Sequence, residues 1–289
     1  MPVTTLIQLQ SMLSPSQLDA LISLLDDSDW EVKQHVREKL IDLGPAVIPV
    51  LEQKWEESFN PVLQKELEEL VHELQFDLVK KRLKAWKDSQ EQDLLEGLWI
   101  LNTYQYPDLE LESLKASIHQ LYVEAWTYFA TDLQPLDQVK ILNHVFFKQL
   151  QFSGNTKNFH SPSNSMLSMV LESKKGNPIS LCSLYLLVAK KLKLPIYGVN
   201  LPNLFVLIYS QGETSFYINA FNKGVIFSRG DLSNYLEQLQ IEPQSAFFDP
   251  CSHLAIVMRF LKNLTSAFEK LGETDKVEEV LELLRILED

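Results

Sequence analysis

The segment that most constrains the fold is a strongly apolar run in the middle of the chain, residues 179–192. Its apolar side chains recur at helical spacing. Gly176-Asn177-Pro178 precedes the run and indicates a turn. We therefore expect a buried central helix, with its inward side chains at Ile179, Leu181, Leu184, Leu187 and Val188.

Three strand-like runs follow the central helix, at residues 196–200, 205–209 and 216–220. The second is apolar throughout, and a Gln211-Gly212-Glu213 turn separates it from the third. We expect a small antiparallel sheet here.

The rest of the chain predicts helices. A helix should begin at Pro15, and an Asp-rich turn at 26–29 should cap the next through Ser28 or Asp29. Leu43-Gly44-Pro45 is a stop signal. Further helical signal covers 62–86, 94–102, 114–129 and 136–150, and Gly272 divides a final hairpin, 254–271 and 276–287. Glu278, Glu279, Glu282 and Asp289 indicate a solvated face of the last helix.

Residues 152–165 differ in composition from their surroundings, because Gly, Asn, Ser and Pro dominate them. Such residues favour an ordered loop or a series of turns. A short helix at 166–173 should follow, capped by Asn164 or Ser165.

Charge and cysteine content limit the classes of partner. The net charge of -13 is spread along the chain, which disfavours nucleic acid and anionic membranes as partners. Only two cysteines occur, Cys182 and Cys251, too few for a disulfide framework. The N-terminal sequence lacks a signal-peptide pattern, and no apolar stretch reaches the ~20 residues that span a bilayer. We expect a cytoplasmic protein.

A series of short motifs from Phe146 to about Tyr235 resembles the SirB-type branch of the transglutaminase-like superfamily. The motifs are Gly154-Asn155, Asn158, Pro162, Asn164-Ser165, Leu167, Val170-Leu171, residues 176–181, residues 194–202, residues 217–222 and Phe227-Ser228-Arg229. Their order and spacing over about 90 residues carry the resemblance. The N-terminal helices are similar to a HEAT repeat, and the hairpin at Gly272 is similar to a tetratricopeptide hairpin.

These resemblances imply an α+β, predominantly helical protein. A helical-repeat N-terminal region at 1–132 should precede a papain/transglutaminase-like core at 133–250 with a small antiparallel sheet. A C-terminal helical hairpin should occupy 251–289. Since a single helical repeat cannot bury its apolar face alone, the N-terminal helices should stack on the helices that follow them.

The resemblance also implies that the catalytic triad is lost. Active relatives have Cys at the start of the central helix, where this chain has Asn177-Pro178. Leu204 occupies the position of their His, and Asn219 that of their Asp. Leucine cannot transfer a proton and asparagine cannot orient an imidazolium electrostatically, so we expect no catalytic residue here. We expect Leu204 to be partly buried and to pack against the central helix.

Cys182 is the best alternative nucleophile. It lies about one and a half turns into the central helix, beyond the amides that lower a thiol pKa, and its neighbours are apolar. A buried structural thiol is the preferred interpretation, and the catalytic alternative needs His160 or His144 nearby. Cys251-Ser252-His253 offers two metal ligands without a second pair at zinc spacing, so we expect neither a metal nor a cofactor.

Six small polar residues should cluster beside the lost triad. They are Asn155, Asn158, Asn164, Ser165, Asn177 and Ser180. The preferred interpretation is that they brace turns by bonding backbone amides. The alternative is a remnant pocket for a small polar ligand or an extended peptide.

The leading functional hypothesis is a non-catalytic protein-interaction or scaffolding protein. Its partner should be another protein. Two alternatives stay open, a hydrolase or acyltransferase that uses Cys182, and a ligand-binding module in the remnant pocket. The sequence leaves the oligomeric state open.

Overall fold

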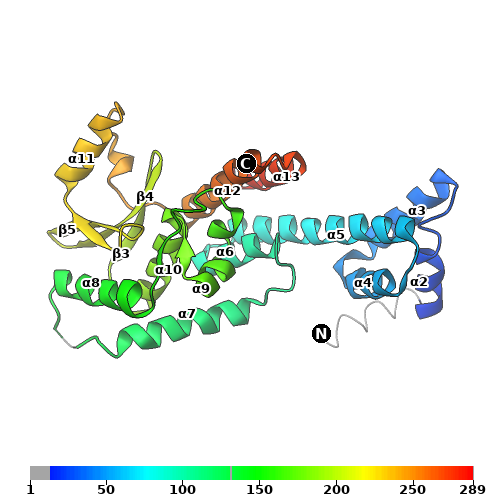
Figure 1. Ribbon diagram of the computed structural model, residues 1–289, viewed down its shortest axis with the longest axis horizontal. Coiled ribbons are helices and arrows are strands. Elements are labelled where there is room, and N and C mark those ends of the chain that lie inside the picture. The colour runs from blue at the N-terminus through cyan, green and yellow to red at the C-terminus, as the bar shows by residue number, and fades with distance from the viewer. Residues whose placement is uncertain (1–13, 131, 289) are drawn as a thin grey trace. The chain divides into compact units, whose positions relative to one another are not determined.

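The computed structural model describes residues 14–130 and 132–288. Contacts divide the chain into two compact units, residues 1–82 and residues 83–289 (Figure 1). Helix α5, Pro61–Asp88, begins in the first unit, and its last residues belong to the second. The units are defined by contacts alone, so the three functional domains expected from the sequence, 1–132, 133–250 and 251–289, stay a prediction.

The first unit is helical. It contains α2, Pro15–Ile22; α3, Trp30–Asp42; η1, Gly44–Val47; α4, Ile48–Glu57; and most of α5. The expected start signals act as predicted, because Ser14 forms a capping box on α2 and Asp29 caps α3. Gly44 has a φ of +69°, which explains why α3 ends before it.

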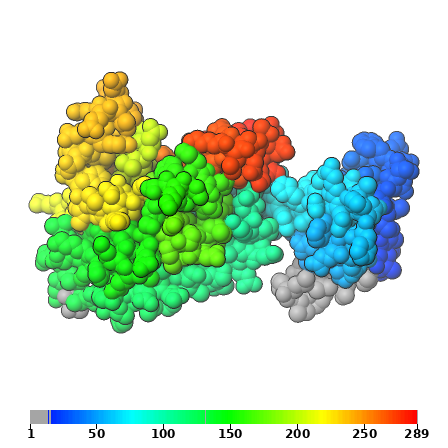
Figure 2. Space-filling view, in the orientation of Figure 1, coloured from blue at the N-terminus to red at the C-terminus, as the bar shows by residue number. Residues whose placement is uncertain are grey.

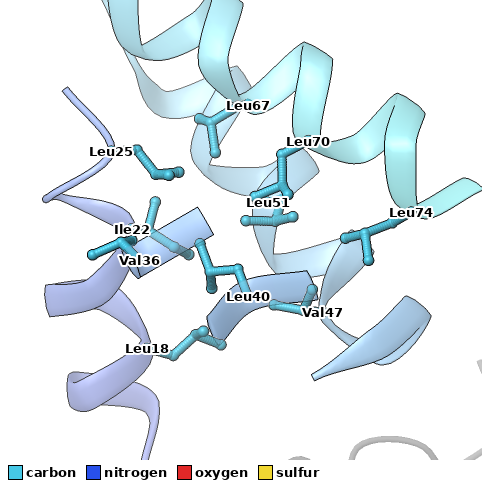
Figure 3. Close-up of a cluster of buried hydrophobic side chains, with 10 residues drawn as sticks. All are labelled: Leu18, Ile22, Leu25, Val36, Leu40, Val47, Leu51, Leu67, Leu70 and Leu74. Carbon is cyan, nitrogen blue, oxygen red and sulfur yellow. The ribbon is translucent and has the colours of Figure 1, made fainter. Parts of the chain in front are cut away.

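Leucine side chains dominate the core of the first unit (Figure 3). Each helix contributes the apolar side chains of one face, so none of them buries its stripe alone. The ten buried members are Leu18, Ile22, Leu25, Val36, Leu40, Val47, Leu51, Leu67, Leu70 and Leu74.

The second unit combines helices with a four-stranded sheet. Its helices are α6, Leu94–Thr103; α7, Leu111–Trp126; α8, Pro135–Asn143; α9, Leu167–Ser173; α10, Pro178–Lys191; α11, Arg229–Gln238; α12, His253–Leu271; and α13, Thr274–Glu288. The strands are β3, Ile196–Leu201; β4, Leu204–Gln211; β5, Thr214–Asn219; and β6, Val225–Phe227. They pair antiparallel in the order β3-β4-β5-β6.

Helix α10 is the central element of the second unit. It packs against β3, β4, α7, α9 and α12, and 11 of its 14 residues are buried. The sheet has an apolar side-chain layer on each face, one packed against α10 and the other against α11. Phe205 belongs to the face toward α10, while Val206 and Leu204 belong to a cluster on the other face that includes Leu232 and Leu236 of α11.

The fold class expected from the sequence is confirmed: the chain is predominantly helical, with a helical region, a core containing a small antiparallel sheet, and a C-terminal hairpin. The buried central helix and the three strands form where the sequence predicts them. In the part of the chain that the structure describes, every helix is too short or too polar to cross a membrane.

Some local elements differ from expectation. Gly176, which the sequence placed in a turn, lies instead in the short strand β2, Lys175–Gly176. This strand pairs in parallel with β1, Ser153–Gly154. Helix α9 has Met166 at its N-cap without a side-chain bond, so the cap predicted at Asn164 or Ser165 is wrong. Both residues lie in a short 3₁₀ helix, η3, Pro162–Ser165. The sequence signal did not reveal β6 or α11.

Two further details concern helix ends and faces. The helical signal at 136–150 resolves into α8 and a π-helical turn, η2, His144–Gln149. The solvated face expected on α13 is wrong for Glu279, and Asp289, assigned to the same face, lies outside the described residues. The Glu279 side chain is half-buried and accepts a hydrogen bond of 2.7 Å from the Tyr104 hydroxyl, which ties the C-terminal hairpin to α6.

Candidate functional site

A cavity of about 410 Å³ lies at the N-terminal end of α10. Five segments of the second unit form its wall: the loop before η3, η3 itself, the start of α10, the turn into β4, and one face of α12. In the space-filling view, the hairpin of α12 and α13 lies beside the segment around residue 160 (Figure 2). The cavity thus lies at the start of α10, where the sequence predicts the position of the lost nucleophile.

Asn177 fixes the start of α10. Its side-chain oxygen accepts a bond of 3.0 Å from the Ser180 backbone N–H, and the Ser180 hydroxyl lies 3.0 Å from the Asn177 backbone N–H. This capping box satisfies two amides that the helix itself cannot pair. The Asn177 amide also donates a bond of 2.9 Å to the Ser165 hydroxyl. Both polar atoms of the side chain therefore take part in structural bonds.

The turns beside α10 are braced in the same way. Asn155 donates from its amide to the Asn164 side-chain oxygen at 2.9 Å, and its own oxygen accepts from the Asn158 backbone N–H. Asn164 donates in turn to the backbone carbonyls of Asn158 and Phe159, at 2.6 and 3.0 Å. Because Asn164 is only 2% exposed, these bonds replace water that the turns would otherwise need.

The six polar residues singled out in the sequence form two hydrogen-bonded groups that meet at the neighbouring residues Asn164 and Ser165. We call them together the polar turn cluster: Asn155, Asn158, Asn164, Ser165, Asn177 and Ser180. Of these, Ser165 and Asn177 line the cavity. Asn155, Asn158, Asn164 and Ser180, all of them described, lie outside its lining.

Half of the polar lining residues come from α12, which sequence reasoning did not single out. We call these residues the α12 wall: Arg259, Asn263, Ser266 and Lys270. Their spacing of four, three and four residues places them on one face of the helix. The other face is buried through residues such as Phe260, Leu264 and Phe268. A polar stripe on an otherwise buried helix is the signal that could have identified them.

The α12 wall carries positive charge. The Nη1 atom of Arg259 donates to the side-chain oxygen of Asn200 and to the carbonyl of Leu201, both at 3.0 Å. Burial lowers the pKa of the Arg259 guanidinium, but an arginine stays charged at neutral pH. Lys270 lies with its Nζ 2.8 Å from Nε2 and 3.0 Å from Nδ1 of His160. Glu269, which is exposed, is the anionic member of the lining.

The expected positions of the lost His and Asp lie on one face of the sheet. Leu204 is half-buried, as predicted, but it packs with Leu201, Val206 and Tyr217 rather than against the central helix. The reason is the alternation of strand side chains, which directs Phe205 toward α10 and Leu204 away from it. The β4–β5 register pairs Leu207 with Ile218, so Asn219 and Leu204 are diagonal neighbours on that face. Their assignment to a lost triad stays a prediction.

Cys182 lies beneath the cavity wall and has no exposed surface. Its Sγ donates a weak bond to the Phe205 carbonyl at 3.6 Å. Burial raises the pKa of the Cys182 thiol far above its ordinary value. His160 contacts Lys270, and His144 is exposed on η2. Neither of the two imidazoles proposed as partners is the hydrogen-bond partner of the buried Cys182 thiol.

Cys251 and His253 stand at the start of α12 and have backbone partners. The Cys251 N–H donates to the Gly198 carbonyl at 2.8 Å, and Nδ1 of His253 lies 2.9 Å from the Gln92 carbonyl oxygen. Within the described residues, no group of three His, Cys, Asp or Glu side chains is arranged to hold a metal ion.

Comparison with known proteins identifies the family and relatives of this chain. A family model of the transglutaminase-like superfamily matches residues 112–262, just over half of the chain. A UPF0162 protein of Xylella fastidiosa is 26% identical over 202 residues, which cover 66% of this chain and 70% of that protein. A UPF0162 protein of Vibrio cholerae is 30% identical over 151 residues, covering 52% of this chain and 56% of that protein.

A third relative is much longer than this chain. Mouse F-box only protein 21 is 25% identical over 249 residues, which cover 75% of this chain but 38% of that protein. No solved structure gives a significant match. The region matched by the family model, residues 112–262, contains the central helix, the sheet and the first half of α12. It therefore includes most of the residues that line the cavity. The chain belongs to the transglutaminase-like superfamily.

Proposed function

We propose that this chain is a non-catalytic protein-interaction protein, built on a transglutaminase-like domain of the SirB type. The observation that carries the proposal is the state of Asn177. It stands where the family resemblance places the nucleophile, and its side chain is consumed by the α10 cap and by Ser165. An amide cannot act as the thiolate that attacks a carbonyl.

The remaining positions support the same conclusion. By the family resemblance, Leu204 and Asn219 stand at the positions of the base and of its orienting carboxylate, and Leu204 packs into an apolar cluster. Acyl transfer by the family's route needs a nucleophile, a proton carrier and a group that orients the carrier. Since each of these positions has a side chain without the required chemistry, we interpret the domain as a pseudoenzyme.

The hydrolase or acyltransferase alternative depends on Cys182. It requires a thiolate at the surface of a cleft, within reach of an imidazole. The burial of Cys182 and the raised pKa of its thiol both oppose this requirement. A buried thiol that donates to a carbonyl is a packing group.

A partner protein would have exposed apolar side chains available on the first unit. Phe59 is 99% exposed and Trp30 is 69% exposed, and Val62 is also exposed. Asn60 bonds Asp26, and Lys33 pairs with Glu66, so the start of α3 and the start of α5 lie together. Large exposed aromatic side chains of this kind are enriched at protein interfaces. We interpret the helices that carry them as HEAT-like.

The relatives agree with a modular role. In mouse F-box only protein 21, sequence of this kind is one part of a longer chain. We interpret the C-terminal hairpin of α12 and α13 as tetratricopeptide-like and as packed on the domain rather than forming an array. The acidic balance of the chain supports a protein partner over nucleic acid or an anionic membrane.

Thiol labelling separates the non-catalytic proposal from the Cys182 alternative. A Cys251→Ser variant leaves Cys182 as the single thiol, and a thiol-reactive chromogenic disulfide reports its reaction. We expect labelling of the native protein to be at least about 100-fold slower than in denaturant. Rapid labelling at neutral pH that is abolished by His160→Gln or His144→Gln would support the enzyme instead.

Photo-crosslinking tests the interaction itself. A photo-reactive phenylalanine analogue replaces Phe59, and the crosslinked proteins are identified in the cells that produce the chain. We expect one dominant partner, lost in a Trp30→Glu variant and retained in Leu271→Glu, which alters an exposed apolar side chain of the second unit. Crosslinks of equal yield in both variants would contradict the proposed surface.

A further inference from the structure

The α12 wall gives the cavity an unbalanced positive charge. Its four polar side chains recur on one helix face, and two of them, Arg259 and Lys270, are cations. Glu269 is the single acidic residue of the described lining. Since the histidine of the lining, His160, is counted as neutral, the lining carries a formal charge of about +1. This is the reverse of the whole chain, whose net charge is -13.

Arg259 is the more informative cation because it is half-buried. Its hydrogen bonds go to neutral oxygens of Asn200 and Leu201, and both come from Nη1. Among the described residues, none of the ion pairs involves Arg259. Buried charged side chains are normally paired, and a guanidinium has five N–H donors. An oxygen anion would provide the missing counter-charge.

Lys270 is in a similar situation at the other end of the wall. Its partner is the His160 imidazole, which is not an anion. The described residues contain no carboxylate within ion-pair distance of its Nζ. Asn263 and Ser266 lie between the two cations on the same helix face, and neither side chain has a hydrogen bond within the described residues. Amide and hydroxyl groups of this kind add donors for a polar ligand.

We propose that this cavity binds a small organic anion whose carboxylate or phosphate oxygens are held by Arg259 and Lys270. The volume of about 410 Å³ suits a small molecule. The Phe159 and Phe205 side chains bound the cavity and would contact the apolar part of the ligand. The proposal goes beyond a role in protein interaction, because it needs no protein partner and involves the second unit alone.

A purely structural role for Arg259 is the competing explanation. Its bonds to Asn200 and Leu201 brace the end of β3, next to the turn into β4. That role accounts for Nη1 but gives no reason for Lys270, Asn263 and Ser266 to face the same cavity. The two explanations differ for Lys270, which has no bond to the β3–β4 turn.

Titration calorimetry on the full chain tests the proposal with three probes. Glutarate supplies carboxylates, inorganic phosphate supplies a phosphate, and glutaramide is the neutral match for glutarate. We expect one anion per chain to bind, with glutarate or phosphate preferred according to the native ligand's charged group, and no binding of glutaramide. Absence of binding by both anions at about 10 mM, or equal binding of glutaramide, would refute the site.

Matched variants locate the binding. Lys270→Gln and Arg259→Gln should each weaken the affinity by about tenfold or more, while Lys262→Gln, an exposed lysine of α12 outside the lining, should change it less than about twofold. Equal losses in Lys270→Gln and Lys262→Gln would show that general charge, and not this cavity, attracts the anion. If Arg259→Gln unfolds, Lys270→Gln and Arg259→Lys still decide the outcome. Because no partner protein is present, these results are independent of the crosslinking at Phe59.

Discussion

The polar turn cluster and the α12 wall border the same cavity but use their polar groups differently. In the cluster, side chains bond one another and nearby backbone, as Asn164 does with Asn155, Asn158 and Phe159. In the wall, Asn263 and Ser266 have no side-chain bond within the described residues, and no carboxylate there pairs with either cation. The polar groups of the cluster stabilise the turns, whereas those of the wall are available to contact a ligand.

Burial separates the two regions in the same sense. The four innermost members of the cluster are all buried: Asn164, Ser165, Asn177 and Ser180. The polar side chains of the wall are half-buried or exposed. A buried polar side chain must be bonded by the protein, whereas a half-exposed one can exchange water for a ligand. Clusters of Asn and Ser are therefore weaker indicators of binding than an unpaired cation on a cavity wall.

Asn164→Ala should give the largest change in stability. The substitution removes three hydrogen bonds at a position that is 2% exposed. At about 1 kcal/mol for each bond, the free energy of unfolding should fall by about 3 kcal/mol. Urea unfolding measures this loss, with Lys157→Ala as the control, since this exposed neighbour has no side-chain bond within the described residues. A loss below about 1 kcal/mol would mean that the cluster does not brace the turns.

Asn177→Ala should cost less, about 2 kcal/mol. The loss combines an N-cap, worth about 1 kcal/mol, with the buried bond to Ser165, worth about the same. Asn177→Ser separates the two parts, since serine is a good cap but is too short to replace the amide donor. Urea unfolding should place Asn177→Ser about midway. Equal losses for both variants would assign the whole effect to the bond with Ser165.

The central helix and the ends of the N-terminal helices could be predicted well from the sequence, because the signals for them are local. The apolar spacing of α10 lies within the helix itself. Similarly, Ser14 and Asp29 cap the helices that begin next to them, and Gly44 ends a helix two positions before it. The failures involve partners distant in sequence. Glu279 has the pattern of a solvated residue, yet it pairs with Tyr104, 175 positions earlier.

The candidate site could be predicted only in part for the same reason. The resemblance located the cavity through Asn177, and the composition of 152–165 located the braced turns. The residues of the α12 wall begin about 80 positions after Asn177, and only the tertiary packing of α12 beside η3 brings them to the cavity. The face of the sheet to which Leu204 belongs depends on strand register, where one residue reverses the result.

Leu204→His tests whether the predicted triad positions belong to the cavity. The side chain is half-buried in an apolar cluster, so the imidazole should lower the free energy of unfolding by about 1 kcal/mol. Anion affinity should not change, because Leu204 is outside the described lining. Leu204→Met is the matched apolar control for the unfolding measurement. A large change in glutarate affinity would place Leu204 on the cavity side.

A double-mutant cycle with Asn219→Asp extends this test. Diagonal neighbours on one face of an antiparallel pair should couple by a few tenths of a kcal/mol, because the carboxylate can accept the ring N–H. Strict additivity in urea unfolding would show that residues 204 and 219 are not neighbours. The residue-by-residue assignment of the lost triad would then be wrong.

Asn263→Ala should have the smallest effect on stability and is the sharpest contrast with Asn164→Ala. Both changes remove an asparagine side chain beside the cavity, but Asn263 has no side-chain bond within the described residues. The free energy of unfolding should therefore change by less than about 0.5 kcal/mol. Glutarate or phosphate affinity should fall by about threefold or more, since an amide donor is lost from the wall. A stability loss as large as that of Asn164→Ala would make the wall a second bracing region, and the distinction between the two sides of the cavity would fail.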